Sequence, residues 1–177
     1  MIIWIDGPSG IGKSSIANRL VELLEGWKAE HLDTDACFQK WGDGNLRYYC
    51  SVLIQDNLAF FADLINTIDE KIESNAGLLI VSMALTTDRC RDMLYAPIAE
   101  KYNAKHFILT ALEDEIIARI DADHGRDKGY AKMYLRSSMD YLEKNYPDAT
   151  RISTSGKSIE DVALYLLEQL KLLGEKE

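Results

Sequence analysis

Residues 2–14 read Ile2-Ile3-Trp4-Ile5-Asp6-Gly7-Pro8-Ser9-Gly10-Ile11-Gly12-Lys13-Ser14, and this stretch decides the fold. Its first half is an apolar run without helical periodicity, which predicts a buried strand. Its second half matches GxxxxGK[ST], the phosphate-binding P-loop or Walker A pattern, and an amphipathic segment follows it. The alternative is a glycine-rich turn between a strand and a helix. The order strand, P-loop, helix favours a nucleotide-phosphate site.

Each part of the P-loop pattern has a physical reason. Glycines let successive backbone N–H groups turn inward around a phosphate chain, and the helix that begins near Lys13 points its positive dipole end there. We expect Lys13 to bridge the β- and γ-phosphates of ATP and the Ser14 hydroxyl to hold Mg²⁺. The residues predicted to bind the nucleotide in this segment are Gly7, Ser9, Gly10, Ile11, Gly12, Lys13, Ser14 and Ser15.

The composition narrows the class of protein. A chain of 177 residues with 47% hydrophobic composition suffices for one well-packed domain, residues 1–177, and is short for two. The net charge of -9 argues against a non-specific binder of nucleic acid or anionic membranes. The N-terminus has no basic segment and no apolar run is long enough to span a bilayer, so we expect a soluble cytoplasmic protein, monomeric or homodimeric.

Two acids follow the predicted second strand, residues 29–32. In an open parallel sheet, ligands bind at the carboxyl ends of the strands. On an extended segment Asp33 and Asp35 would point the same way and could face one site. Phosphoryl transfer needs one carboxylate near Mg²⁺ and one that accepts the proton of the attacking hydroxyl. The alternative is an Asx turn or a helix cap.

Strand patterns alternate with helical patterns along the rest of the chain. Further strands are predicted at residues 77–83, 105–110 and 149–153. Helices are predicted within residues 46–72, 93–102, 112–122 and 133–142 and after Ser158. This alternation predicts an α/β fold with about five parallel strands in a three-layer arrangement, helices covering both faces of the sheet.

Several polar segments near the predicted ligand edge have two interpretations. Arg47 lies in an aromatic-rich stretch that suits a loop or short helix over a pocket, or simple packing. Arg89, after the third strand, could bind a substrate carboxylate or phosphate, or belong to a solvated helix start. The segment 124–136, with Arg126, could close over the phosphates as a lid or merely connect two helices. The loop around Ser155 could border the adenine ring, although turn chemistry explains it equally well.

The chain resembles the small P-loop kinases of the shikimate kinase, chloramphenicol phosphotransferase and gluconate kinase type. The resemblance rests on residues 1–14, Asp33, Asp35, 105–110 with Arg119 behind them, and 153–158. Within that group the chain is most similar to the tunicamycin-resistance protein family, in residues 1–5 and at Lys128-Gly129.

The resemblance implies a P-loop kinase-like fold, Mg-ATP as the donor and a small hydroxylated acceptor such as an antibiotic or nucleoside-like compound. By position, Asp33 would lie near Mg²⁺, Asp35 would engage the acceptor hydroxyl and Arg119 would contact the nucleotide. Relatives often carry another arginine where this chain has Asp123. The lid charge would therefore come from Arg126, Lys128 or Arg136.

The sequence is compatible with two functions. In the first, an ATP-dependent phosphotransferase, Lys13 holds the phosphates, Asp35 accepts the acceptor proton and a lid residue such as Arg126 offsets the developing charge. In the second, the same fold sequesters a nucleotide-like or antibiotic ligand without turnover. Asp35 favours the enzyme, since sequestration needs no general base. The patterns DxxG and NKxD of Ras-like GTPases do not occur in the sequence.

Overall fold

A five-stranded parallel sheet forms the centre of the computed structural model, which describes residues 1–44, 54–74, 77–124 and 128–174. The strand order is β2-β3-β1-β4-β5, and each neighbouring pair is parallel. The strands are β1 (Ile2–Asp6), β2 (Glu30–Asp33), β3 (Leu79–Ser82), β4 (Lys105–Thr110) and β5 (Thr150–Ser153). The predicted α/β fold with five parallel strands is confirmed.

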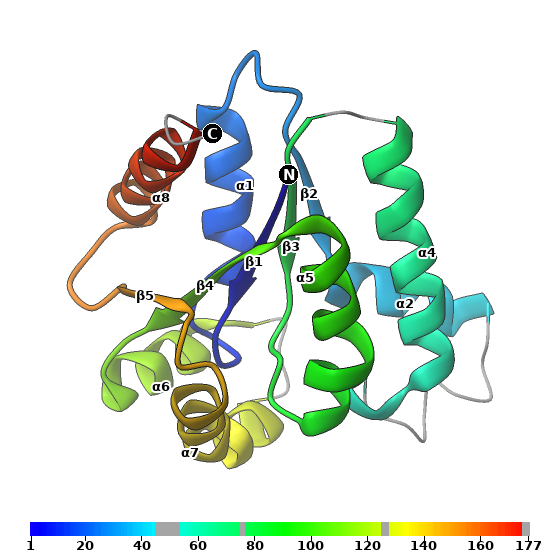
Figure 1. The fold of residues 1–177 in the computed structure, drawn as a ribbon. Helices are drawn as coiled ribbons and strands as arrows, with labels where there is room; N and C mark the ends of the chain where they lie inside the picture. The colour runs from blue at the N-terminus through cyan, green and yellow to red at the C-terminus, as the bar shows by residue number, and fades with distance from the viewer. Residues whose placement is uncertain (45–53, 75–76, 125–127, 175–177) are drawn as a thin grey trace.

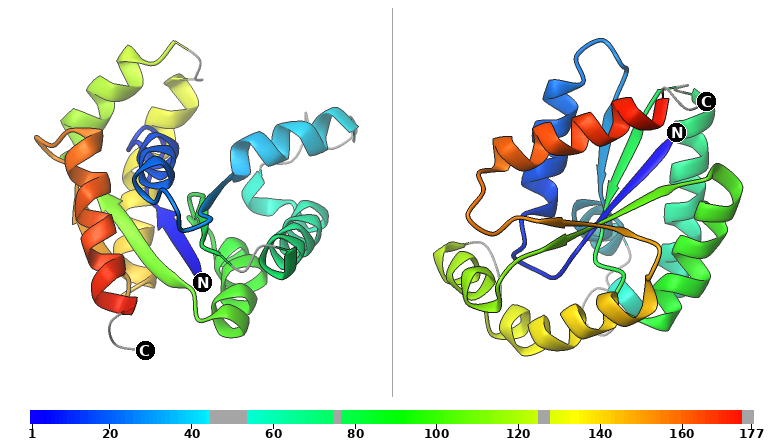
Figure 2. Two further views of the ribbon diagram at one scale, coloured as in Figure 1. Left: turned by 90° about the horizontal axis from the view of Figure 1, so that it is seen from above. Right: turned by 60° about the vertical axis from the view of Figure 1, so that its left-hand side comes forward.

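Helices cover both faces of this sheet, as Figures 1 and 2 show. The helices are α1 (Lys13–Leu23), α2 (Thr34–Gly44), α4 (Leu58–Ser74), α5 (Ala96–Tyr102), α6 (Glu113–Ala122), α7 (Lys128–Asn145) and α8 (Ile159–Gly174), with a 3-10 turn η1 (Ile54–Asp56) and a π-helical segment η2 (Cys90–Tyr95). Helices α1 and α8 pack on one face, and α4 and α5 lie on the other (Figure 2). In the described ranges no helix has the length and apolar character needed to cross a bilayer.

Strand β1 is buried on both faces, which explains its unbroken apolar run. Ile3 and Ile5 belong to the core under α1 and α8, whereas Ile2 and Trp4 belong to the core under α4 and α5. All four side chains have 0% exposure. Because side chains alternate along a strand, the central strand of a three-layer fold must be apolar at successive positions.

Two helices differ from their predicted bounds. The helical pattern predicted over residues 46–72 begins as α4 only at Leu58, because the Asn57 side chain accepts a hydrogen bond from the Phe60 amide (3.0 Å) and caps that helix. The part of the prediction at residues 46–53 lies outside the described residues. Helix α7 begins at Lys128, earlier than the predicted residue 133, so the described part of the expected lid is largely helical.

Candidate functional site

The P-loop connects β1 to α1 and requires glycine at three positions. Gly7, Gly10 and Gly12 have φ angles of 144°, 85° and 104°, which L side chains rarely adopt. A Cβ atom on Gly10 would lie 2.5 Å from Cγ1 of Ile120 on α6. The loop therefore owes its shape both to its own backbone and to close packing against α6.

Lys13 stands at the start of α1 and folds back over the loop. Its ammonium donates hydrogen bonds to the carbonyl oxygens of Gly7 (2.8 Å) and Pro8 (3.2 Å). Ser14 and Ser15 follow in the first turn of α1, where backbone N–H groups and the positive end of the helix dipole favour an anion. This end of α1 has the composition and backbone of a phosphate site.

A cleft of about 370 Å³ lies beside the P-loop, between α6 and the segment that links β5 to α8. Arg119 of α6 lines the cleft and donates through Nη1 to the Ile11 carbonyl (3.3 Å) and the Thr154 hydroxyl (2.8 Å), and through Nη2 to the Thr154 carbonyl (3.0 Å). The volume lies in the range of ligand pockets. The structure thus brings Arg119, the P-loop and the last loop together, although these segments are far apart in the sequence.

In the last loop, Thr154 lines the cleft beside the P-loop, whereas Ser155 does not. The Ser155 hydroxyl accepts a hydrogen bond from the Leu112 amide (3.0 Å) and so connects the last loop to the start of α6. Its neighbour Thr154, which the sequence analysis did not single out, lines the cleft and binds Arg119. The run of small hydroxyl residues indicated the loop but not which of its members faces the cleft.

The acidic pair at the end of β2 is arranged differently from the prediction. Asp33 is the last residue of β2, but the chain turns helical at Thr34, so the expected extended segment is wrong. Thr34 is fully buried and its hydroxyl donates to the Ser82 carbonyl (3.0 Å), which turns the chain into α2.

Asp33 caps the new helix. One of its carboxylate oxygens accepts from the amides of Asp35 (3.0 Å) and Ala36 (3.4 Å), as the alternative interpretation had it. Asp35 is exposed in the first turn of α2. Both acids remain at the ligand edge of the sheet.

The arginines that follow β3 are engaged with carboxylates. Arg89 Nη1 lies 3.8 Å from an Asp56 carboxylate oxygen, both side chains being half exposed. Arg91 pairs with Asp92 (2.7 Å from Nε) and with Asp88 (3.0 Å from Nη1), and the hydrogen bond from Arg91 lowers the pKa of Asp92. This environment matches the charged helix start that was the alternative for Arg89. Arg47 and Arg126 lie outside the described residues.

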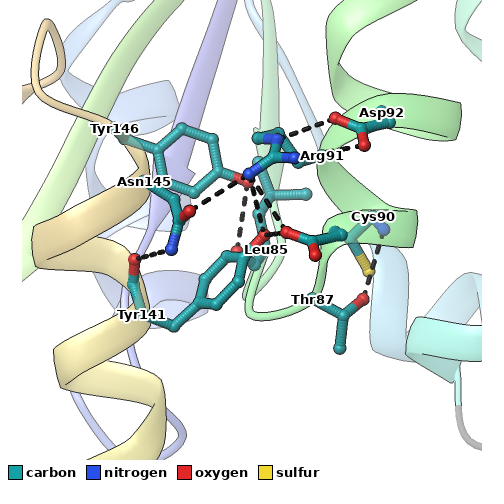
Figure 3. Close-up of polar contacts among 9 residues, drawn as sticks. Leu85, Thr87, Cys90, Arg91, Asp92, Tyr141, Asn145 and Tyr146 are labelled. Carbon is teal, nitrogen blue, oxygen red and sulfur yellow. Dashed lines mark hydrogen bonds and ion pairs between the residues drawn. The ribbon is translucent and has the colours of Figure 1, made fainter.

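Arg91 also connects η2 to α7 (Figure 3). Its Nη1 donates to the Asn145 side-chain oxygen (3.1 Å), and the Tyr141 hydroxyl donates to Asp88 (2.8 Å). At the other end of α7, Lys128 donates to the Asp121 carbonyl (2.7 Å) and Lys132 pairs with the Asp121 carboxylate (2.6 Å). Helix α7 is therefore attached to α6 at its start and to η2 near its end.

Asp6, the last residue of β1, is a functional candidate that the sequence analysis missed. Its side chain is fully buried, and one oxygen accepts from the amides of Gly7 (2.6 Å) and Leu85 (3.0 Å). The other oxygen lies 3.0 Å from Nε2 of His106 on β4. A charged residue at the end of a buried apolar run was the available signal, because a buried carboxylate needs donors.

Two oxygen donors suited to Mg²⁺ lie at the start of α1 and at the end of β2. The Ser14 hydroxyl and the Asp33 carboxylate are ligands of the type that Mg²⁺ takes together with substrate phosphates and water. The described residues contain no group of three or more His, Cys, Asp or Glu side chains placed to hold a metal by themselves. The donor set thus suits a cation that arrives with a nucleotide.

A second cleft, of about 500 Å³, includes no P-loop residue. Its walls come from the amino ends of β4 and β5 and from the end of α7, including His106, Tyr146 and Thr150. Ligands of parallel α/β sheets bind outside the carboxyl ends of the strands, so the smaller cleft beside the P-loop is the better candidate for nucleotide binding.

Comparison with solved structures identifies the fold as that of the small P-loop kinases. The tunicamycin resistance protein of Deinococcus radiodurans has a TM-score of 0.69 and 22% identity, covering 96% of this chain and 94% of that one. A gluconokinase of Sinorhizobium meliloti 1021 has a TM-score of 0.64 and 18% identity (98% and 93% covered), and a shikimate kinase of Bacteroides thetaiotaomicron has 0.61 and 15% (97% and 98% covered). The resemblance expected from the sequence is confirmed at the level of the fold.

Sequence comparison gives a shorter match. The chain is 49% identical over 41 residues to a probable adenylyl-sulfate kinase of Archaeoglobus fulgidus, which is 22% of this chain and 26% of that protein. The match therefore spans about a quarter of the length of this curated relative. No family model matches the chain.

Proposed function

We propose that the protein is an ATP-dependent phosphotransferase, which moves the γ-phosphoryl group of Mg-ATP to a hydroxyl of a small molecule. The observation that carries this proposal is the convergence of the P-loop, Arg119 and Thr154 on one cleft at the start of α1. The short match to a probable adenylyl-sulfate kinase and the kinase-like fold support the same class of reaction.

The P-loop and Lys13 would hold the phosphates. The ammonium of Lys13 now binds two loop carbonyls, so a phosphate chain in the loop would offer it negatively charged oxygens in their place. Arg119 lines the neighbouring cleft and is fixed there by Thr154, which suits contact with the rest of the nucleotide. Ser155 would shape this border through its bond to Leu112.

Asp35 would accept the proton of the acceptor hydroxyl. It is an exposed carboxylate in the first turn of α2, at the same sheet edge as the P-loop. Mg²⁺, when bound with ATP, offsets phosphate charge, and the Ser14 hydroxyl and Asp33 carboxylate would hold it. One oxygen of Asp33 is already used to cap α2, so the role at the metal would fall to its other oxygen.

The acceptor would lie between α2 and the segment after β3. Arg89 would contribute to its binding only by leaving Asp56, and Arg47 and Arg126 are proposed for acceptor and lid roles from the sequence alone. A lid over the phosphates would exclude water from the transfer. Since a tunicamycin resistance protein shares the fold, antibiotics and nucleoside-like compounds belong among the acceptors to be tried.

The test is transfer to a panel of nucleosides, nucleoside antibiotics, aminoglycosides, sugars and small acids, followed by mass spectrometry. Asp35→Asn should lower the rate by about 10²- to 10⁴-fold, the usual contribution of a general base, while Mg-ATP still binds. Glu100→Gln, the same change at an exposed carboxylate of α5, should leave the rate unchanged. Near wild-type transfer by Asp35→Asn would rule out Asp35 as the base.

A further inference from the structure

We propose that Asp6 and His106 act as a positioning pair, which fixes the P-loop relative to the segment after β3 and so sets the distance between the transferred phosphoryl group and its acceptor. This inference rests on the proposed function, because the groups that it positions are a nucleotide and an acceptor. The P-loop, the segment after β3 and strand β4 meet at the Asp6 side chain.

The carboxylate of Asp6 joins the start of the P-loop to the amide of Leu85, which is 79 residues further along the chain than Asp6. Its Oδ1 accepts from the amide of Gly7, the first residue of the P-loop, and from the amide of Leu85, beyond the end of β3. An exposed carboxylate would gain little from such bonds, but this one has 0% exposure. Because a buried charge without donors is very costly, the two amides and the carboxylate hold one another in place.

His106 holds the second oxygen of this carboxylate. Its Nε2 lies 3.0 Å from Asp6 Oδ2, and its side chain is only 6% exposed. The imidazole ring contacts Tyr95 and Tyr146, with centroid distances of 4.7 and 4.8 Å. A ring confined by two aromatic neighbours has little freedom to turn away, so the orientation of Asp6 is fixed as well.

Leu85 is held at both of its backbone groups. Its amide donates to Asp6, and its carbonyl accepts from the Tyr146 hydroxyl at the end of α7 (3.2 Å; Figure 3). Burial, with the nearby Asp6 carboxylate, raises the pKa of Tyr146, so its hydroxyl keeps the proton that it donates. The chain that continues from Leu85 reaches Arg91, which Asn145 of α7 also binds.

Loss of the contacts at Asp6 would shift the P-loop relative to the segment after β3. This shift would separate the reactants rather than remove a contact with a ligand. Asp6, His106, Leu85 and Tyr146 do not line the cleft beside the P-loop, so their substitution should change Mg-ATP binding much less than the rate. A misplacement of about 1 Å can cost on the order of 10²-fold in rate. The pair should therefore affect kcat much more than nucleotide affinity.

The experiment compares Asp6→Ala and Asp6→Asn with the wild-type protein, and with Ile98→Ala as a core control from α5 on the same side of the sheet. Amide hydrogen exchange at Gly7 and Leu85, the Kd for Mg-ATP and kcat with the acceptor found by the panel are measured. We expect Asp6→Ala to expose both amides to exchange and to lower kcat by about 10²-fold with Kd within about threefold.

Asp6→Asn tests whether a side-chain oxygen at this position is enough, and Tyr146→Phe is a milder change at the same contacts. Asp6→Asn keeps a side-chain oxygen for the two amides, so it should restore most of the protection and of kcat. Should Asp6→Ala fail to fold, Tyr146→Phe removes only the hydroxyl at Leu85 and should still lower kcat with unchanged Kd. Unchanged exchange at Gly7 and Leu85, or losses of kcat no larger than in Ile98→Ala, would overturn the proposal. Absence of turnover in the wild-type protein would count against the proposed function, while exchange at the two amides would still report on the pair.

Discussion

The ammonium of Lys13 lies 2.8 Å from the carbonyl oxygen of Gly7, the first residue of the loop that it closes. The same ammonium also donates to the Pro8 carbonyl oxygen, so two carbonyl oxygens of the P-loop bind its positive charge. The P-loop combines glycine backbone, the Lys13 ammonium and the N-terminus of α1. This combination suits the binding of a phosphate chain.

Lys13→Ala should greatly weaken nucleotide binding. Removal of one partner from a charged contact usually costs 2–5 kcal/mol, or roughly 30-fold or more in Kd. Isothermal titration calorimetry with Mg-ATP measures this effect. Lys171→Ala, at an exposed lysine of α8, is the matched control and should bind normally. Equal affinity of Lys13→Ala and the control would refute the P-loop assignment.

Gly10→Ala should damage the nucleotide site more than a positive φ angle alone can explain. Its new Cβ would meet Ile120 at 2.5 Å, whereas Gly26, with a φ angle of 91°, has open space around the same position. Gly26→Ala is therefore the matched control. Gly10→Ala and Gly26→Ala both carry the backbone strain of a positive φ angle, roughly 1–2 kcal/mol. Only Gly10→Ala should also displace the loop from α6, lowering Tm further and raising Kd. Identical effects of the two variants on Kd would contradict the close packing at Gly10.

Arg119→Ala should weaken the attachment of the P-loop to the loop between β5 and α8, and so weaken binding of Mg-ATP. Three hydrogen bonds from its guanidinium would be lost, and bonds to charged donors contribute about 1.5–3 kcal/mol each at most. We expect Kd for Mg-ATP to rise at least tenfold with the helical circular dichroism signal preserved. Arg119→Lys should recover only part of the affinity, because lysine cannot bind Thr154 through two atoms.

A control for Arg119 comes from β5. Arg151 also makes several hydrogen bonds to carbonyl oxygens, among them those of Ala149 (3.2 Å) and Tyr146 (3.2 Å), but it does not line the cleft. Arg151→Ala should therefore lower Tm without changing Kd. A larger change in Kd for Arg151→Ala than for Arg119→Ala would contradict the position of the nucleotide site.

His31 should make stability depend on pH below about 6.5. Its ring nitrogens face Asn18 Oδ1 (2.7 Å) and Ser82 Oγ (2.8 Å), and burial lowers its pKa, an effect that Asp33 opposes. The unfolded chain therefore takes up this proton first as the pH falls, so the free energy of unfolding should decrease from about pH 6.5 downward. His31→Gln should remove that part of the slope in urea titrations.

The role of Asp33 in this titration can be measured directly. Its negative charge raises the pKa of His31 against the effect of burial, so Asp33→Asn should lower the pKa of His31 further. The His31 ring proton signal, followed by NMR, reports the midpoint in both proteins. A midpoint that rises in Asp33→Asn would contradict the electrostatic effect of Asp33 on His31.

The sequence predicted the parallel sheet and the P-loop because both depend on local signals. An apolar run that ends in a glycine-rich loop is interpretable without knowledge of neighbours, and β4 was predicted with its observed bounds, Lys105–Thr110. The turn into α2 at Thr34, between Asp33 and Asp35, was not predictable in this way. It depends on the buried contact of Thr34 with Ser82, a residue 48 positions away.

Other features of the site also depend on long-range contacts. Arg119 was expected at the nucleotide only through resemblance, and its placement depends on Thr154 and Ile11, distant in sequence. Asp6 is the last residue of the predicted strand, and the sequence analysis did not single it out. Its role follows only from its hydrogen bonds to Gly7, Leu85 and His106. Local patterns therefore predicted which segments form the site, whereas tertiary contacts determine which side chains face it.

The most direct measurement uses ATP labelled with ¹⁸O in its γ-phosphoryl group and the acceptor panel described above. Our account predicts an acceptor whose mass increases by one labelled phosphoryl group in the presence of the wild-type protein, with no such product from Lys13→Ala. If the protein instead retains a compound tightly, unmodified and with its ATP unconsumed, sequestration rather than phosphoryl transfer is the function.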